Sequence, residues 1–148
     1  MEHFGLELEE NKSRLIEFGR FADENRRKRG LGKPETFDFL GFTHYCSKSR
    51  YGKFRVKRKT SKKKFAKKCK DVNKWIAGMR TLPVQKIIKR VNRMLVGYYH
   101  YYGITDNAKN LARFKYVVTK LLLNGLIEEA RNAVTDGTNS TYCLENIL

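Results

Sequence analysis

The side chains of this sequence that are able to do chemistry are mostly phosphate-binding bases. Nineteen of its 32 lysines and arginines fall within residues 48–93, and this stretch holds a single acid, Asp71. Residues 1–47 have a net charge of −1 and residues 94–148 are neutral, so the formal net charge of +17 sits in the central block. A surface that only has to be soluble normally mixes both signs. The block therefore favours a binding surface for a polyanion such as nucleic acid over a plain solvated lysine surface.

These bases recur at spacings that gather them on single faces. Lys86, Lys89, Arg90 and Arg93 fall on one side of a helix at 100° per residue, and the lysines before them form a similar arc. Lysine and arginine neutralise phosphates and release counterions, which gives affinity without sequence information. The bases that we expect to bind nucleic acid are Arg55, Lys57, Lys59, Lys63, Lys64, Lys67, Lys70, Lys74, Lys86, Lys89, Arg90 and Arg93.

A first amphipathic helix is predicted between an N-cap at Thr60 or Ser61 and a stop at Gly78. Its apolar residues fall in one narrow stripe, and five lysines occupy the opposite arc. The stripe consists of Phe65, Cys69, Val72 and Ile76.

Two further helices follow after short connections. One begins at residues 81–83, where the proline suits a first turn, and stops at Gly103. The other starts near Asp106 or Asn107 and runs through Leu122. Three amphipathic helices joined in this way make a small bundle. The apolar face of the middle helix consists of Val84, Ile87, Ile88, Val91, Met94, Leu95, Tyr98, Tyr99 and Tyr102.

The first 59 residues are predicted to form two short β-hairpins, so we expect an α+β fold. Gly5–Leu8 and residues 15–18 alternate like the strands of one hairpin, and the polar residues 22–35 resemble an exposed loop. Domain boundaries are therefore expected after residue 59, where the helices begin, and after residue 123, where the helical pattern weakens.

The second hairpin contains the most apolar run in this half of the chain. FDFLGFTHY, residues 37–45, is interpreted as one strand covered on both faces. A turn around residues 49–52 leads to the return strand, in which Phe54 and Val56 are expected to point inward and Arg55 and Lys57 outward.

The aromatic run LVGYYHYYG, residues 95–103, invites comparison with base-stacking surfaces. Most of its tyrosines lie on the apolar face of the middle helix, where core packing is the better interpretation. His100 and Tyr101 lie toward the basic side and are the only stacking candidates. Gly97 also lies toward that side, where a missing side chain would let a phosphate backbone approach closely.

Several other kinds of site are disfavoured. The three cysteines are far apart and form no CxxC pair, and His44 with Cys46 makes a weak metal pair, so no metal site is predicted. No apolar run approaches the ~20 residues of a membrane span, and no leader peptide is visible. We therefore expect a cytoplasmic protein that does not bind membranes.

Three separated motifs, in order, resemble the C-terminal part of a bacterial group II intron-encoded reverse transcriptase and maturase. They are GLELEENKSRLIEFG, FDFLGFTHYCSKSRYGKFRVKRKTSKKKF and LPVQKIIKRVNRMLVGYYHYYGITDN, and the likeness runs from about Gly5 to about Leu123. The resemblance implies a palm remnant over residues 1–59 and a thumb with a maturase-specific region over residues 60–123. In the family, this region holds intron RNA and the template–primer duplex.

The resemblance also assigns roles to individual residues. Lys12 matches the lysine of the late palm motif, a candidate proton donor to pyrophosphate in polymerases. The FLGF stretch resembles the primer-grip hairpin, with Leu40 and Gly41 at its tip. The primer-grip residues it implies are Phe39, Leu40, Gly41 and Phe42.

The sequence departs from the family where catalysis is concerned. Nucleotide transfer in the family uses Mg²⁺ held by aspartates, including a Tyr-x-Asp-Asp box that precedes the late palm motif. These 148 residues contain no Asp-Asp pair. We therefore expect no enzyme activity, no cofactor, and no catalytic residue beyond the unsupported Lys12.

The resulting hypothesis is an RNA-binding remnant of a group II intron maturase, whose missing fingers and palm are absent or supplied by another chain. Its partner would be structured intron RNA or an RNA/DNA duplex. Two alternatives stay open: a basic structural protein that binds nucleic acid, and a pseudogene product without a function.

Residues 124–148 are predicted to be a divergent and disordered tail. Family members usually continue after the position of Leu123 with Lys-Trp-Leu-Asn-Arg-Arg-Ser-Gln, whereas this chain continues NGLIEEAR. A codon string that encodes these eight residues gives Trp-Leu-Asn-Arg-Arg-Ser-Gln when it is read two nucleotides later. A frameshift near Leu123 is our hypothesis, and ordinary divergence of a surface helix is the alternative.

Overall fold

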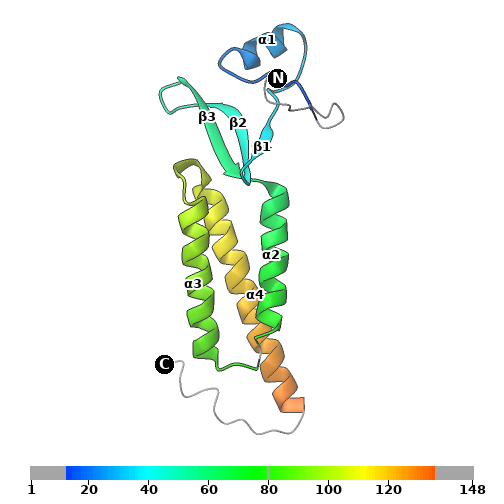
Figure 1. Ribbon diagram of the computed structural model, residues 1–148, viewed down its shortest axis with the longest axis vertical. Coiled ribbons are helices and arrows are strands. Elements are labelled where there is room, and N and C mark those ends of the chain that lie inside the picture. Colours follow the sequence, from blue (N-terminus) through cyan, green and yellow to red (C-terminus); the bar gives the residue numbers. More distant parts are fainter. Residues whose placement is uncertain (1–12, 80, 136–148) are drawn as a thin grey trace, which may run out of the picture. The chain divides into compact units, whose positions relative to one another are not determined.

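A computed structural model describes residues 13–79 and 81–135 of the chain (Figure 1). The chain divides into two compact units, residues 1–58 and 59–148. A short helix and a three-stranded sheet come first in the sequence, and a group of long helices follows. The expected α+β fold is therefore confirmed.

The first unit contains a helix where a loop was expected. Helix α1 (Ala22–Lys28) occupies the first half of residues 22–35, so the loop prediction is wrong there. Acids lie in its first turn and bases in its last turn, which complements the helix dipole at both ends. Residues 15–18 form no strand, so this half of the first predicted hairpin is also wrong. Its other half, Gly5–Leu8, lies outside the described residues.

The FDFLGFTHY stretch is a hairpin by itself rather than one strand. β1 (Phe37–Phe39) pairs with β2 (Phe42–Lys48), and Phe39 lies opposite Phe42. Leu40 and Gly41 between them have φ angles of 47° and 81°. Two successive positive φ values are those of a type I′ turn, whose twist matches that of the paired strands. The one-strand interpretation is wrong, because alternation does not reveal a two-residue turn inside an apolar run.

The sheet has the order β1-β2-β3, so β3 (Phe54–Thr60) is an edge strand. The turn before it closes at Ser49, whose N–H donates to the Lys53 carbonyl at 2.8 Å, as expected. The expected burial of Phe54 and Val56 is wrong, since both side chains are 37 % exposed while Lys57 is half-buried. A small sheet offers too little apolar surface to cover an edge strand on either face.

The second unit is a group of three helices that begins as the sequence predicts. Helix α2 (Lys62–Ala77) follows Ser61, whose Oγ accepts a hydrogen bond from the Lys64 N–H, and it ends at Gly78. Helix α3 (Val84–Tyr102) follows Pro83 and ends at Gly103. A 3-10 turn, η3 (Thr105–Asn107), leads into helix α4 (Ala108–Thr135).

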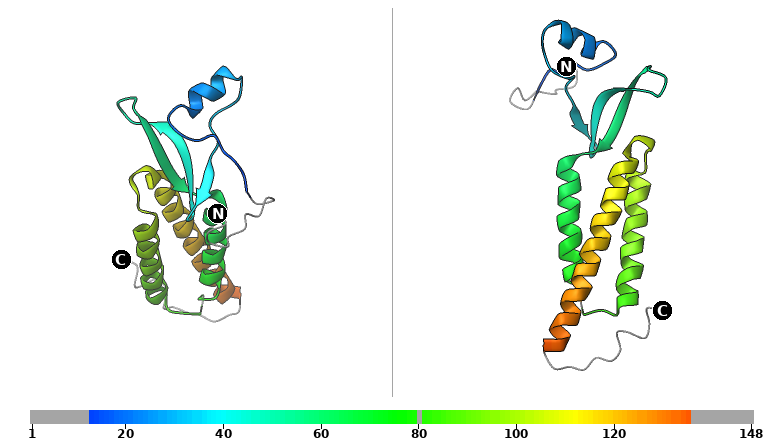
Figure 2. Two further views of the ribbon diagram at one scale, coloured as in Figure 1. Left: turned by 45° about the horizontal axis from the view of Figure 1, so that its top comes forward. Right: turned by 180° about the vertical axis from the view of Figure 1, so that it is seen from behind.

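Helix α4 packs against both α2 and α3, and opposite views place it on one side of that pair (Figures 1 and 2). The core side chains come from all three helices and, apart from Met79 beyond the end of α2, lie on the predicted apolar stripes. Ile88 is 41 % exposed, so its predicted place on the apolar face of the middle helix is wrong. Tyr98 stacks on Phe114 with ring centroids 3.7 Å apart, so the core role expected for this tyrosine is confirmed. The buried core consists of Val72, Ile76, Met79, Ile87, Val91, Tyr98, Phe114 and Val118.

Helix α4 also continues beyond Leu123, where disorder was expected. It runs to Thr135, so the prediction of a disordered tail is wrong for residues 124–135, and residues 136–148 lie outside the described part. Gly125 is buried, and a Cβ added there would lie 3.3 Å from Ile76 Cγ2. The glycine that weakens the helix in isolation thus permits close packing of α4 on α2.

A buried asparagine joins the ends of all three helices. Asn107 Nδ2 donates to Thr60 Oγ1 at 2.8 Å and to the Tyr102 carbonyl at 3.0 Å. Its Oδ1 accepts from the Thr60 N–H at 2.8 Å and from Asn110 Nδ2 at 3.0 Å. Asn107 is only 1 % exposed, so these bonds are shielded from water. They fix the start of α2 against the end of α3 and the start of α4.

Candidate nucleic-acid interface

The lysines of α2 form an exposed arc away from the core. The helix buries Val72 and Ile76 and half-buries Phe65 and Cys69, as the predicted stripe requires. All five lysines predicted for the opposite arc are exposed. They are Lys63, Lys64, Lys67, Lys70 and Lys74.

The bases of α3 form an exposed row on one flank of that helix. Ile87, Val91 and Tyr98 are buried on the core side, which leaves the four predicted bases in solvent. Arg90 Nη1 lies 3.7 Å from the sulfur of Met79, the core residue just beyond α2. This contact places the basic flank of α3 on the side of the helix that faces the end of α2.

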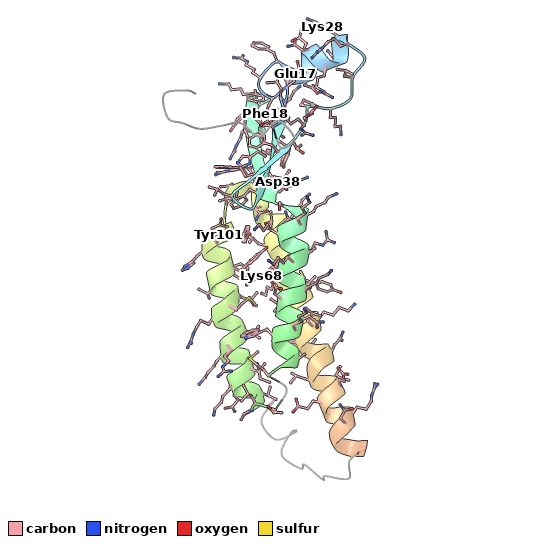
Figure 3. All side chains as sticks on the ribbon, turned by 45° about the vertical axis from the view of Figure 1, so that its right-hand side comes forward. Glu17, Phe18, Lys28, Asp38, Lys68 and Tyr101 are labelled. Carbon is pink, nitrogen blue, oxygen red and sulfur yellow. The ribbon has the colours of Figure 1, made fainter. Side chains whose placement is uncertain are left out.

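Lys68 extends the basic surface on α2 and was missed by the sequence argument. It flanks the apolar stripe, being three residues from Phe65 and four from Val72, and it is exposed. Figure 3 shows it on the flank of α2 that is turned toward α3, while Tyr101 lies at the C-terminal end of α3. Its position beside the stripe was the available signal. From the sequence we considered only the lysines opposite the stripe, and Lys68 lies beside it.

The bases of α2 and α3 form no ion pairs with acids among the described residues, although α2 itself contains the exposed Asp71. Around α1, by contrast, Glu35 lies 3.2 Å from Arg14 and 3.6 Å from Arg26, and Glu17 pairs with Arg29. The charge around α1 is thus largely compensated, whereas that of α2 and α3 remains available to an external anion.

The candidates at the C-terminal end of α3 lie together on the basic flank. Gly97, His100 and Tyr101 are all exposed, and Tyr101 retains 56 % of its surface. Its ring meets that of Tyr102 edge-on, with centroids 4.7 Å apart. The ring is therefore supported from one side and open to solvent.

The predicted bases of the return strand are divided between the two units. Arg55 and Lys59 are exposed and Lys57 is half-buried, as befits an edge strand. Arg55 and Lys57 belong to the first unit, whereas Lys59 begins the second. Lys59 therefore shares a unit with the rows on α2 and α3.

The residues that resemble the primer grip form the β1–β2 turn. Phe39 and Leu40 are 60 % and 68 % exposed, and Gly41 and Phe42 are half-buried. This turn presents an apolar surface on a chain that is otherwise strongly basic. Lys12, the remaining motif residue, lies outside the described residues.

The described residues offer no site for a bound metal. No group of three or more His, Cys, Asp or Glu side chains comes together among them. Cys46 Sγ lies 3.7 Å from the Gly19 carbonyl, and His44 stacks on Phe37 at 4.8 Å. The weak pair of His44 and Cys46 is thus engaged locally. No helix within the described residues is long and apolar enough to cross a membrane.

In the second unit, the titratable groups whose pKa values are perturbed belong to the core rather than to the basic surface. Burial raises the pKa of the Cys69 thiol, and the Arg113 guanidinium nearby partly opposes this. Burial also raises the pKa of Tyr98 to about 12, and that of Tyr102 in the same direction. Arg113 lies over the Phe65 ring at 5.4 Å, where it covers the seam between α2 and α4. The three shifts are explained by burial in the core.

Comparison with known proteins connects this surface to a family. Residues 48–132, more than half of the chain, match the family model described as type II intron maturase. The match covers the whole basic block and continues past Leu123, so the expectation that the likeness ends there is wrong. No curated protein and no solved structure matches the chain.

Proposed function

The chain belongs to the type II intron maturase family, and from this premise we propose that the exposed bases of α2 and α3 bind structured RNA. The observation that carries the proposal is the uncompensated charge on two helices that both pack against α4. The α3 row and the α2 lysines bear no acid partner among the described residues, and phosphates are the polyanion that such rows neutralise.

Intron RNA is favoured over other nucleic acids because the family match supplies that partner and the surface suits it. Folded RNA consists largely of A-form helices. Their major groove is deep and narrow, so protein side chains cannot read the bases in it. Such helices are held through phosphates and shape, for which two rigid rows of bases are sufficient. A duplex of RNA and DNA with similar geometry would bind the same rows.

We propose that this chain contributes binding rather than nucleotide transfer. Two-metal transfer requires carboxylates that hold both ions. The 148 residues contain no Asp-Asp pair, and the described residues bring no three metal ligands together. The residues present therefore do not fit a pair of Mg²⁺ ions. The exposed apolar tip at Phe39 and Leu40 is, in this proposal, where a chain with fingers and palm docks.

The experiment measures the affinity for a folded intron RNA as a function of salt concentration. Neutralising Lys86, Lys89, Arg90 and Arg93 together to glutamine should reduce the log–log slope by about 3, since each lost phosphate contact contributes roughly 0.7–0.9. Circular dichroism should show an unchanged helix content, because all four side chains are exposed.

A matched control removes the same charge from the outer part of α4. The exposed bases available for it are Lys109, Lys115, Lys120 and Arg131. If α2 and α3 form the binding surface, the control should change the slope much less. Equal losses in both variants would show a diffuse attraction, and an unchanged slope in the first would remove α3 from the site. Equal affinity for a B-form DNA duplex of the same length would instead support a general nucleic-acid-binding protein.

A further inference from the structure

Helix α3 contains an interior glycine that nothing inside the protein requires. Gly97 is exposed, its φ is not in the left-handed region, and a Cβ added to it would meet no atom within 4 Å. A glycine inside a helix costs up to ~1 kcal/mol relative to alanine. The other glycine within a described helix, Gly125, is accounted for by its contact with Ile76. No contact among the described residues therefore explains a glycine at residue 97, so we consider a group that binds from outside.

The surroundings of Gly97 suit one kind of external group. Arg93 lies one turn before it and Tyr101 one turn after it, and residues so spaced have Cβ atoms about 5–6 Å apart. Long side chains on a helix lean toward its N-terminus, which is the direction of Gly97 from Tyr101, and the space at Gly97 itself stays open because no atom lies within 4 Å of a Cβ there. Tyr102 supports that ring edge-on, and 56 % of Tyr101 stays exposed. The helix thus presents a cation, bare backbone and an aromatic ring in succession.

We propose that a phosphodiester backbone of the bound RNA lies directly against α3 at Gly97. The Arg93 guanidinium would pair with the phosphate, and a neighbouring unpaired base would stack on the Tyr101 ring. This proposal rests on the RNA binding proposed above and locates its closest approach. A packing protein helix is disfavoured as the occupant, because Arg90, Arg93 and His100 lie within two turns of Gly97 and would have to be desolvated.

A side-chain size series at residue 97 tests this contact without changing any charge. Gly97→Ala and Gly97→Leu both fit the free protein, since the position opens to solvent. The alanine variant should raise Tm by up to roughly 4–8 °C through helix propensity alone. It should nevertheless weaken RNA binding about tenfold, the size of one lost charge-assisted hydrogen bond, and the leucine variant should weaken it further.

The control adds equal bulk elsewhere on the surface. Ala112→Leu enlarges an exposed residue of α4 and should leave RNA affinity unchanged. If both Gly97 variants bind RNA as tightly as the parent while the α3 glutamine variant still loses its salt slope, the close approach is wrong and the proposed function stands. If the parent itself shows no binding to folded RNA, the proposed function fails instead. Loss of affinity in Gly97→Ala together with a lowered Tm would also overturn the contact, because it would indicate a packing role.

Discussion

The polar junction at Asn107 makes the sharpest prediction about stability. Replacing this residue with alanine removes four hydrogen bonds and leaves the buried Thr60 N–H without a partner, whereas the Tyr102 carbonyl keeps its bond from the Ile104 N–H. Each bond contributes about 1 kcal/mol net, and each stranded buried group costs about 1–3 kcal/mol. Because water can partly reach an enlarged site, we expect a total loss of about 3–5 kcal/mol. That is a large part of the 5–15 kcal/mol typical of a domain.

Urea denaturation followed by circular dichroism measures this loss as a fall in the midpoint with the m-value unchanged. Asn110→Ala is the matched control, because it removes only the half-buried bond to Asn107 Oδ1 and should cost less than about 1 kcal/mol. A loss below about 1 kcal/mol for Asn107→Ala would refute the role assigned to the junction.

Two further substitutions test the core. The Tyr98 hydroxyl is buried and makes no hydrogen bond among the described residues. Thr60 nearby only partly offsets the rise in the Tyr98 pKa that burial causes. Removing the hydroxyl in Tyr98→Phe should therefore leave the free energy of unfolding at pH 7 unchanged or slightly higher. The Tyr98 pKa is about 12 in the folded protein and about 10 in the unfolded chain, so the free energy of unfolding of the parent should fall by up to about 2 kcal/mol as the pH rises between these values. Alkaline denaturation curves should show a smaller fall for Tyr98→Phe, and identical curves for the two proteins would contradict this. Gly125→Ala should cost about 1 kcal/mol net in urea denaturation, since crowding against Ile76 outweighs the gain in helix propensity, and Ile76→Leu, which lacks the Cγ2 methyl, should relieve that cost. Independent, additive effects of the two changes would show that they do not meet.

The helix boundaries of the second unit followed from the sequence because their signals are local. The Ser61 cap, the Gly78 and Gly103 ends and the start after Pro83 each depend on residues within one turn. The Asn107 junction was not predicted, because its partners at residues 60 and 102 are brought together only by the folded bundle. A helix start near Asn107 was expected, but its tertiary role has no pattern in the sequence.

The β-rich part was predicted less well because its elements are short. The Leu40–Gly41 turn consists of two residues inside an apolar run, and it was visible only through the FLGF resemblance. Helix α1 has seven residues and lacks an apolar stripe, so its composition pointed to a loop. The burial of β3 depends on what covers a sheet edge, which alternation alone does not reveal.

The prediction of a tail beginning at Leu123 failed for a reason that concerns the helix as a whole. Periodicity weakens after Leu123 because Gly125 interrupts it and because Glu128 and Glu129 follow, yet Leu126 still packs against the core cluster. The family match reaches residue 132, so this part of α4 shares the family pattern. Sequencing the gene tests the frameshift hypothesis directly, and an alternative frame without Trp-Leu-Asn-Arg-Arg after Leu123 would reject it.

Gly97 and Gly125 both lie inside helices, but the space beside them differs in the structure. Each interrupts a helix at a similar cost in propensity. At Gly125 the space is filled by Ile76 of α2, so the missing side chain serves the fold. At Gly97 the space is open and lies between an arginine and an exposed tyrosine, so the missing side chain has no use until a ligand arrives. A methyl group should therefore destabilise the protein at one position, and at the other should stabilise the protein while it blocks the RNA.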